Sequence, residues 1–155
     1  SAELRAHAES FGLLLQMTNI VKDVTDDWPR GWCFIPETIC ESNGTHSPDL
    51  LSTTESQAGI AAVDQINQHA RKFYGDAVAY VLALPPSATA LRRFCLLPML
   101  LAGKTLDIAL GNSAVVDPNR AVKVTREVVA QTIEQVETLL QDEHALRALS
   151  LPEPA

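Results

Sequence analysis

The segment FGLLLQMTNIVKDVTDDWPRG, residues 11–31, combines an apolar helical pattern with a row of amide and carboxylate side chains. A helix turns by about 100° per residue, so side chains three or four residues apart share a face. Four polar side chains fall on one arc of about 80° of such a helix, namely Gln16, Asn19, Asp23 and Asp27. This set, called the polar row below, predicts an amphipathic helix with a specific chemical face.

The two acids of the row are four residues apart, so their like charges repel on a helix. A divalent cation such as Mg²⁺ would offset that repulsion, because it binds carboxylate oxygens and leaves other positions for water and phosphate. An alternative is a solvated face, since Thr18, Lys22 and Thr25 lie on the adjoining arc. The spacing leaves both interpretations open.

The composition bounds the class of protein. The chain has 155 residues, of which 46% are hydrophobic and 20% charged, so it is long enough for one domain with a sizeable core. We expect the domain to cover residues 1–150, with a disordered tail at 151–155. The formal net charge of -7 disfavours nucleic acid as a partner.

The cysteines and the hydropathy bear on the compartment. Cys33, Cys40 and Cys95 form no C-x-x-C pair, which argues against a disulfide scaffold or a zinc site and for a reducing environment. No apolar run reaches the roughly 18 residues of a membrane span, because Pro98 and Lys104 interrupt the longest one. The sequence therefore predicts a cytoplasmic protein.

The helical period dominates the chain, and no stretch alternates as a strand does. The expected fold is an all-α bundle of about four long helices. The predicted helices cover residues 2–27, 55–84, 87–110 and 117–149. Residues 28–54 form a long connection, and connections of that length tend to be functional or mobile.

Local signals set the predicted boundaries. Ser87 is a candidate cap for the third helix, Pro98 should kink it, and Gly111 should end it. Asp117 and Pro118 have the residue types of an N-cap and a first helical position, so they predict the start of the fourth helix.

Several segments together carry a resemblance to a known family. The polar row fits the pattern Q-x-x-N-I-x-x-D-x-x-x-D, and R-G-W-C-F-I-P follows at residues 30–36. Phe94-Cys95-Leu-Leu-Pro98 and Ala121-Val-Lys-Val come later in the chain. In order and spacing these segments resemble the squalene/phytoene synthases, and the Phe-Cys-x-x-Pro segment is typical of the squalene-forming branch.

The resemblance implies a fold and an activity. The chain would be the C-terminal half of an isoprenoid-synthase-type helical domain, with the N-terminal half as its missing partner. The activity would be head-to-head condensation of two farnesyl diphosphates through presqualene diphosphate, followed by NADPH-dependent reduction to squalene. The oily product implies transient, peripheral contact with a membrane surface.

The resemblance also implies roles for individual residues. Asp23 and Asp27 would bind Mg²⁺ or Mn²⁺ and act in catalysis, together with Phe94 and Cys95 at the hydrocarbon pocket. The substrate would contact Gly12, Gln16, Asn19, Arg30 and Pro98. The nicotinamide cofactor would contact Lys123 and Asn112.

Two departures from the family pattern keep alternatives open. Trp32 stands where the family usually has an arginine that contacts the diphosphate, and Met99 stands where the squalene branch commonly has glutamine. One alternative is a phytoene- or dehydrosqualene-type synthase that carries out no reduction. Another is a catalytically inactive helical interaction module.

Overall fold

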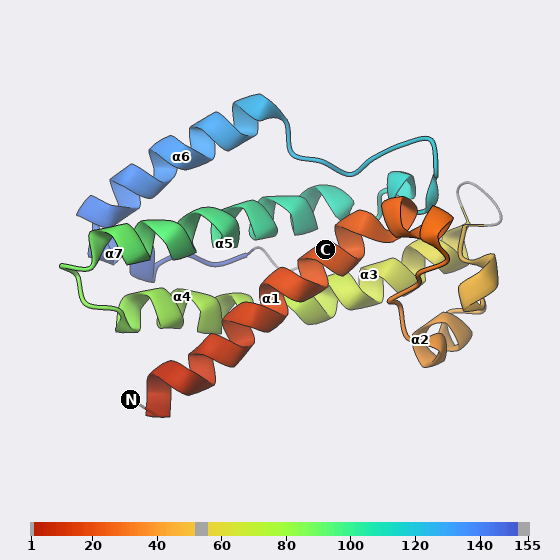
Figure 1. Cartoon of the computed structure of the whole chain (residues 1–155), viewed down its shortest axis with the longest axis horizontal. Helices are drawn as coiled ribbons and strands as arrows, with labels where there is room; N and C mark the ends of the chain where they lie inside the picture. Colours follow the sequence, from red (N-terminus) through yellow and green to blue (C-terminus); the bar gives the residue numbers. More distant parts are fainter. Residues whose placement is uncertain (1, 52–55, 152–155) are drawn as a thin grey trace. The chain divides into compact units, whose positions relative to one another are not determined.

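The computed structural model describes residues 2–51 and 56–151 of the chain. Within these residues it contains helices and no strands, so the all-α prediction is confirmed. The elements (Figure 1) are α1 (Ala2–Asp27), η1 (Trp28–Arg30), α2 (Glu37–Ser42), η2 (Ser47–Asp49), α3 (Gln57–Arg71), α4 (Tyr74–Ala83), α5 (Thr89–Ala109), η3 (Ser113–Val116), α6 (Arg126–Gln141) and α7 (Glu143–Arg147).

Helix α1 has the bounds predicted for the first helix, residues 2–27. Leu14, Val21 and Val24 are buried along its apolar side. A short 3-10 turn, η1, follows, and Gly31 ends it with a φ of 73°. That left-handed conformation favours glycine, which lets the chain reverse directly after the polar row.

The prediction of one helix over residues 55–84 was wrong. Residue 55 lies outside the described residues, and the rest forms two helices, α3 and α4, separated by a turn at Lys72 and Phe73. The amide of Phe73 donates to the carbonyl of Ala70, three residues earlier, at 3.1 Å. This 3-10-type hydrogen bond makes a tighter turn than the α-helical i to i−4 bond and follows the end of α3. The apolar period continues across this turn, so periodicity could not reveal it.

The prediction that Asp117 and Pro118 begin a helix was also wrong. A carboxylate oxygen of Asp117 accepts from the amide of Asn119 at 2.9 Å, which makes a local turn at the end of η3. Helix α6 begins at Arg126 instead, where the Thr125 hydroxyl accepts from the amide of Val128 at 3.2 Å. The predicted fourth helix then ends early, at Gln141, and α7 continues after a short break.

Helix α5 agrees with its prediction more closely. It begins at Thr89, two residues after the predicted cap Ser87, and it contains Pro98. Gly111 follows its end with a φ of 64°, as expected of a glycine that terminates a helix. Of the tail predicted at 151–155, residues 152–155 lie outside the described part.

The chain divides into two compact units, and α1 and α5 contribute to both. The first unit comprises residues 1–16, 70–104 and 124–155, and its buried residues include Tyr74, Val81, Leu96, Met99, Val136 and Leu146. The second unit comprises residues 17–69 and 105–123, and its buried residues include Val21, Leu50, Val63, Leu106, Val115 and Val116. Neither helix α5 nor any other described helix is long and apolar enough to cross a membrane.

Candidate functional site

The polar row lies on the accessible side of α1. Gln16 and Asn19 are exposed, while the side chains of Asp23 and Asp27 keep 30% and 18% of their surface exposed. Gly12, a predicted substrate contact about one turn before Gln16 on α1, is also exposed. The carboxylates therefore remain open to a ligand.

The adjoining arc of α1 is mixed, since the Lys22 side chain keeps 32% of its surface exposed whereas the two threonines are buried. Thr18 and Thr25 are 5% and 6% exposed, so they belong to the core and not to a solvated face. These two threonines therefore add no accessible polar surface to the polar row. Helix α1 buries small hydroxyl residues beside the row and exposes the acids.

Two cations neutralise the acids of the row. The Lys22 ammonium lies 2.8 Å from a carboxylate oxygen of Asp23, and the Arg30 guanidinium lies 3.1 Å from a carboxylate oxygen of Asp27. Arg30 also stacks over the ring of Trp32, 5.6 Å from its centroid. Exposed pairs of this kind contribute about 0.2–1 kcal/mol each, so a ligand could replace them at little cost.

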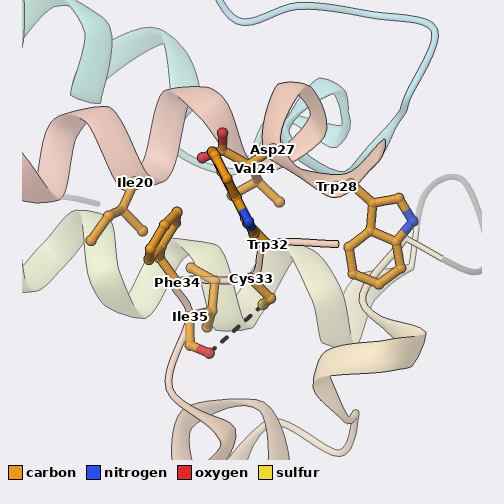
Figure 2. Close-up of a pocket in the computed structure, with 8 residues that line it drawn as sticks. All are labelled: Ile20, Val24, Asp27, Trp28, Trp32, Cys33, Phe34 and Ile35. Atoms are coloured by element: carbon orange, nitrogen blue, oxygen red, sulfur yellow. Dashed lines mark hydrogen bonds between the residues drawn. The ribbon is translucent and has the colours of Figure 1, made fainter. Parts of the chain in front are cut away.

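An aromatic loop follows the row in the second unit. Trp32 and Phe34 are 53% and 55% exposed, and their ring centroids lie 6.4 Å apart in an edge-on arrangement. A narrow crevice of about 10 Å³ separates this loop from α1 (Figure 2), with room for about one water molecule. The crevice is lined by Ile20, Val24, Asp27, Trp28, Trp32, Cys33, Phe34 and Ile35.

A larger, open hollow shares part of this wall. Its volume is about 410 Å³, and Trp28, Gly31, Trp32, Cys33, Ser47 and Pro48 line it. Most of the lining is apolar. Trp28, Trp32 and Cys33 line both the crevice and the hollow, so the two spaces adjoin at these residues.

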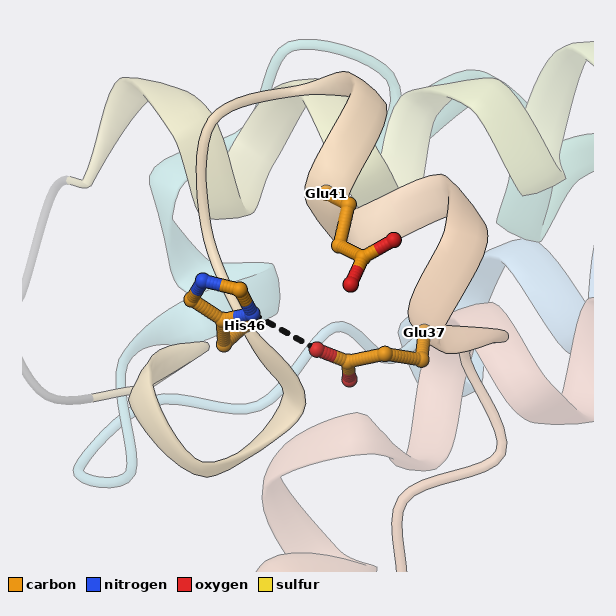
Figure 3. Close-up of side chains that lie close together, drawn as sticks. All are labelled: Glu37, Glu41 and His46. Carbon is orange, nitrogen blue, oxygen red and sulfur yellow. Dashed lines mark hydrogen bonds and ion pairs between the residues drawn. The ribbon is translucent and has the colours of Figure 1, made fainter.

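A second polar cluster lies on α2 and the turn that follows it (Figure 3). One ligand atom each from Glu37, Glu41 and His46 lies within 4.8 Å of the others, and all three residues are exposed. The Glu37 carboxylate already accepts from His46 Nδ1 at 2.8 Å and from the amide of Ser47 at 2.9 Å. These bonds attach the turn at His46 and Ser47 to Glu37 at the start of α2. The three residues Glu37, His46 and Ser47 are called the anchor below.

The hydrogen bonds of the anchor shift the pKa values of Glu37 and His46. Hydrogen bonds from Ser47 and His46 lower the pKa of Glu37 from 4.5 to about 2, and the bond to Glu37 raises the pKa of His46 above 6.5. The Glu37 contribution to stability is present above its unfolded pKa and is lost as the pH falls towards 2. The His46 contribution is present below pH 6.5 and is lost as the pH rises through the higher folded value.

We expect Glu37→Gln to bring the pKa of His46 back towards 6.5, because that substitution removes the carboxylate that stabilises the imidazolium. An NMR titration of the His46 ring protons measures this directly. Glu41→Gln is the matched control, since Glu41 makes a smaller contribution to the same pKa. Equal shifts in the two variants would contradict the anchor.

The predicted hydrocarbon-pocket residues lie on α5 in the first unit. Phe94 is 76% exposed, whereas Cys95 is 4% exposed and its burial raises the pKa of its thiol. Pro98 is partly buried inside the same helix. Of Phe94, Cys95 and Pro98, only Phe94 is exposed on the surface of α5.

The predicted cofactor residues lie in the second unit. The Asn112 side chain is bonded at both ends, since its amide donates to the Ile108 carbonyl at 2.9 Å and its oxygen accepts from the amide of Ala114 at 2.9 Å. Asn112 thus caps η3. The Lys123 ammonium is 64% exposed and lies 3.8 Å from a carboxylate oxygen of Asp26, so it remains accessible.

The donor atoms of the polar row fit a hard divalent cation. Asp23 and Asp27 supply carboxylate oxygens, Gln16 and Asn19 supply amide oxygens, and Mg²⁺ and Mn²⁺ prefer such ligands. The cations that pair with the acids are partly exposed and replaceable. For NADPH, the accessible ammonium of Lys123 fits a phosphate, whereas the amide of Asn112 is already used within the protein.

Sequence reasoning missed two features of the second unit. The i, i+4 spacing of Glu37 and Glu41 was a signal for one of them, but the approach of His46 depends on the turn after α2. The hollow joins Trp28 and Trp32 to Ser47 and Pro48, residues that no periodicity connects. Both features depend on how the connection 28–54 folds.

The described part of the chain is all-α, and α1 presents an accessible row of amide and carboxylate side chains. The sequence profile of the squalene/phytoene synthases matches residues 1–143. The chain belongs to the squalene/phytoene synthase family.

Individual relatives agree with this assignment. The chain is 28% identical over 131 residues to a squalene synthase of Saccharomyces cerevisiae, covering 84% of this chain and 29% of the relative. It is 26% identical over 137 residues to squalene synthase 1 of Arabidopsis thaliana, covering 86% and 32%. In structure it matches a solved complex of TcSQS with the ligand BPH1237, with a TM-score of 0.74 at 22% identity.

The match is to part of each relative. The alignment covers 96% of this chain and 45% of the TcSQS chain. The chain spans about a third of the length of the curated relatives it matches. At this identity the structural likeness establishes the fold, which is the helical fold of squalene synthase.

Proposed function

We propose that this chain carries part of the active site of a farnesyl-diphosphate farnesyltransferase. The complete protein would join two farnesyl diphosphates head to head through presqualene diphosphate and would reduce the product to squalene with NADPH. One observation carries the proposal: a chain of this family presents Asp23 and Asp27, with Gln16 and Asn19, on the accessible side of α1.

The polar row would act on the diphosphate. Asp23 and Asp27 would hold Mg²⁺ or Mn²⁺, and the bound ion would neutralise the charge that builds on the departing pyrophosphate. Gln16 and Asn19 would orient the same group through their amides. The Arg30 guanidinium would add planar N–H donors for the diphosphate. Its pair with Asp27 and its contact with the Trp32 ring already position it beside the row.

The first step balances without an oxidant or reductant. Pyrophosphate leaves one farnesyl diphosphate, its allylic carbon bonds to the double bond of the second, and a proton is lost as the cyclopropane closes. The carbocation requires apolar surroundings that exclude water. Phe94 and Cys95 are the candidates to line them, with Pro98 shaping their helix and Gly12 admitting the substrate beside α1.

The later reduction and the partners are further parts of the proposal. Lys123 is the candidate for the NADPH phosphate, with Asn112 near the cofactor. The partner is the N-terminal half of the same domain, since the chain spans about a third of its curated relatives. Delivery of a hydrocarbon product implies peripheral contact with a membrane.

Trp32 favours a second candidate function. Where the family usually places an arginine, this chain has an indole ring, which holds no diphosphate. Arg30 compensates in our proposal. If it does not, the chain is a helical interaction module without catalysis.

The test is product analysis with the complete protein, labelled farnesyl diphosphate and Mg²⁺, with and without NADPH. Squalene formed only with NADPH supports the full proposal. Presqualene diphosphate, or a dehydrosqualene-type product, that persists with NADPH supports the condensation and overturns the reduction. Absence of turnover by a folded complete protein overturns the enzyme proposal in favour of the interaction module.

A further inference from the structure

The hollow beside the aromatic loop has the size and the surface of a binding site for an apolar chain. Its volume of about 410 Å³ falls in the range of roughly 300–1,000 Å³ that is usual for small-molecule sites. Both tryptophans of the protein, Trp28 and Trp32, form part of its wall, and the ring of Pro48 adds a further apolar surface.

The polar side chains of this wall are already engaged. The Ser47 hydroxyl donates to the Glu37 carboxylate, and the Cys33 thiol lies 3.8 Å from the carbonyl of Ile35. Among the described residues, none of those that line the hollow is charged. The described part of the wall therefore offers a metal ion or a phosphate no charged side chain to pair with, which disfavours both as ligands.

The hollow and the crevice beside Asp27 share three lining residues, Trp28, Trp32 and Cys33. Arg30 lies over the Trp32 indole and pairs with Asp27. A ligand with an anionic head at Asp27 and Arg30 would therefore meet an apolar space beside Trp32.

We propose that this hollow binds the hydrocarbon chain of an isoprenoid, with Trp28, Trp32 and Pro48 as its contact surface. The proposal rests on the proposed function for the class of ligand, since the head group would occupy the polar row. It assigns a site and a role to Trp32, the residue at which the chain departs from its family. The indole contributes to tail binding where an arginine would contact a diphosphate.

The probe is farnesol, an isoprenoid alcohol without a diphosphate, used below the concentration at which it aggregates. Cys33 lines the hollow and is partly exposed, whereas Cys40 and Cys95 are buried, so alkylation mapped by mass spectrometry isolates Cys33. We expect farnesol at about ten times its Kd to slow alkylation of Cys33 about tenfold. The tryptophan emission should shift with the same saturation curve.

A matched pair of variants separates binding from general stickiness. Pro48→Asp places a charge in the wall and should abolish protection. Pro118 is also an exposed proline of the same unit but lies outside the wall, so Pro118→Asp should leave protection intact. Circular dichroism confirms that both variants are folded. Protection that survives Pro48→Asp, or no saturable protection of the original chain, overturns the inference.

Two further measurements distinguish the remaining outcomes. If Cys33 in the complete protein resists alkylation with no ligand present, another part of the protein covers the hollow and the inference is overturned. Pyrophosphate with Mg²⁺ should leave Cys33 unprotected, because it lacks a hydrocarbon. Its binding to the polar row tests the proposed function separately, so either proposal can fail without the other.

Discussion

Asp27→Asn should lower the turnover of farnesyl diphosphate by the complete protein about 10³-fold at saturating Mg²⁺, the size expected when an electrostatic contact to a developing anion is lost. The substitution keeps the shape of the side chain and removes its charge. Asp23→Asn should have a similar effect. The double variant should lose little more, since residues that act on one metal ion are not additive.

The neighbouring acid supplies the matched control. Asp26 precedes Asp27, is more exposed, at 52%, and pairs with Lys123 outside the polar row. Asp26→Asn should therefore leave the rate of the first condensation within about threefold of the original. Equal losses in the Asp26 and Asp27 variants would show that the row holds no metal.

Stability measurements separate the loss of chemistry from the loss of folding. Removing one of two like charges at i, i+4 relieves about 0.2–0.5 kcal/mol of repulsion. Losing the exposed Arg30 pair costs a similar amount. The free energy of unfolding should thus hardly change. A variant that loses activity at constant stability is the signature of a functional residue.

The sequence was sufficient to predict features that depend on a single helix. The bounds of α1 and the arc of the polar row follow from periodicity and from Pro29 and Gly31. The family resemblance then gave the acids a chemical purpose. What the sequence missed depends on tertiary context, such as the turn at Lys72 and Phe73, which leaves the apolar period unbroken.

The misplaced start of the fourth helix illustrates the same limit. Asp117 and Thr125 both accept a hydrogen bond from a backbone amide two or three residues later. One bond makes an isolated turn and the other caps α6. The local chemistry is alike in the two cases, so residue type alone could not decide which one begins a helix.

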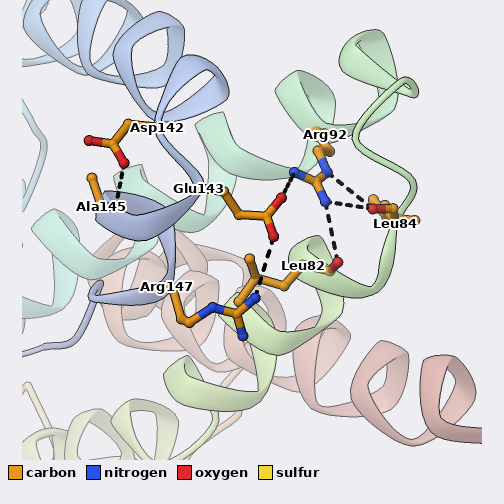
Figure 4. Close-up of polar contacts among 7 residues, drawn as sticks. All are labelled: Leu82, Leu84, Arg92, Asp142, Glu143, Ala145 and Arg147. Atoms are coloured by element: carbon orange, nitrogen blue, oxygen red, sulfur yellow. Dashed lines mark hydrogen bonds and ion pairs between the residues drawn. The ribbon is translucent and has the colours of Figure 1, made fainter.

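The largest effect on stability should come from a residue that no motif includes. Arg92 is 4% exposed and lies near the start of α5. Its guanidinium donates to the Leu84 carbonyl at 2.7 and 3.1 Å, to the Leu82 carbonyl at 3.3 Å and to the Glu143 carboxylate at 3.3 Å (Figure 4). Arg92 thus joins the end of α4, the start of α5 and α7 within the first unit.

We expect Arg92→Met to lower the free energy of unfolding by about 3 kcal/mol, because a buried carbonyl left without a donor, such as that of Leu84, costs roughly 1–3 kcal/mol, and the part-buried Leu82 carbonyl also loses its donor. At about 2–4 °C per kcal/mol for a chain of this size, the midpoint of thermal unfolding should fall by roughly 10 °C. Arg92→Lys retains the charge without the planar fork, so its loss should be intermediate. It also keeps the test measurable if the methionine variant fails to fold.

Arg93, next to Arg92 in the sequence, is the matched control with an exposed ion pair. Arg93 makes a two-pronged pair with Glu137 at 2.6 and 2.9 Å, shorter than the Arg92–Glu143 pair, yet its side chain is 46% exposed. Arg93→Met should change the free energy of unfolding far less than Arg92→Met, because solvent screens the pair and rehydrates Glu137. Glu143→Gln should cost equally little, since that carboxylate is 48% exposed. If Arg93→Met proved as costly as Arg92→Met, charge pairing and not the capping of buried carbonyls would stabilise this unit.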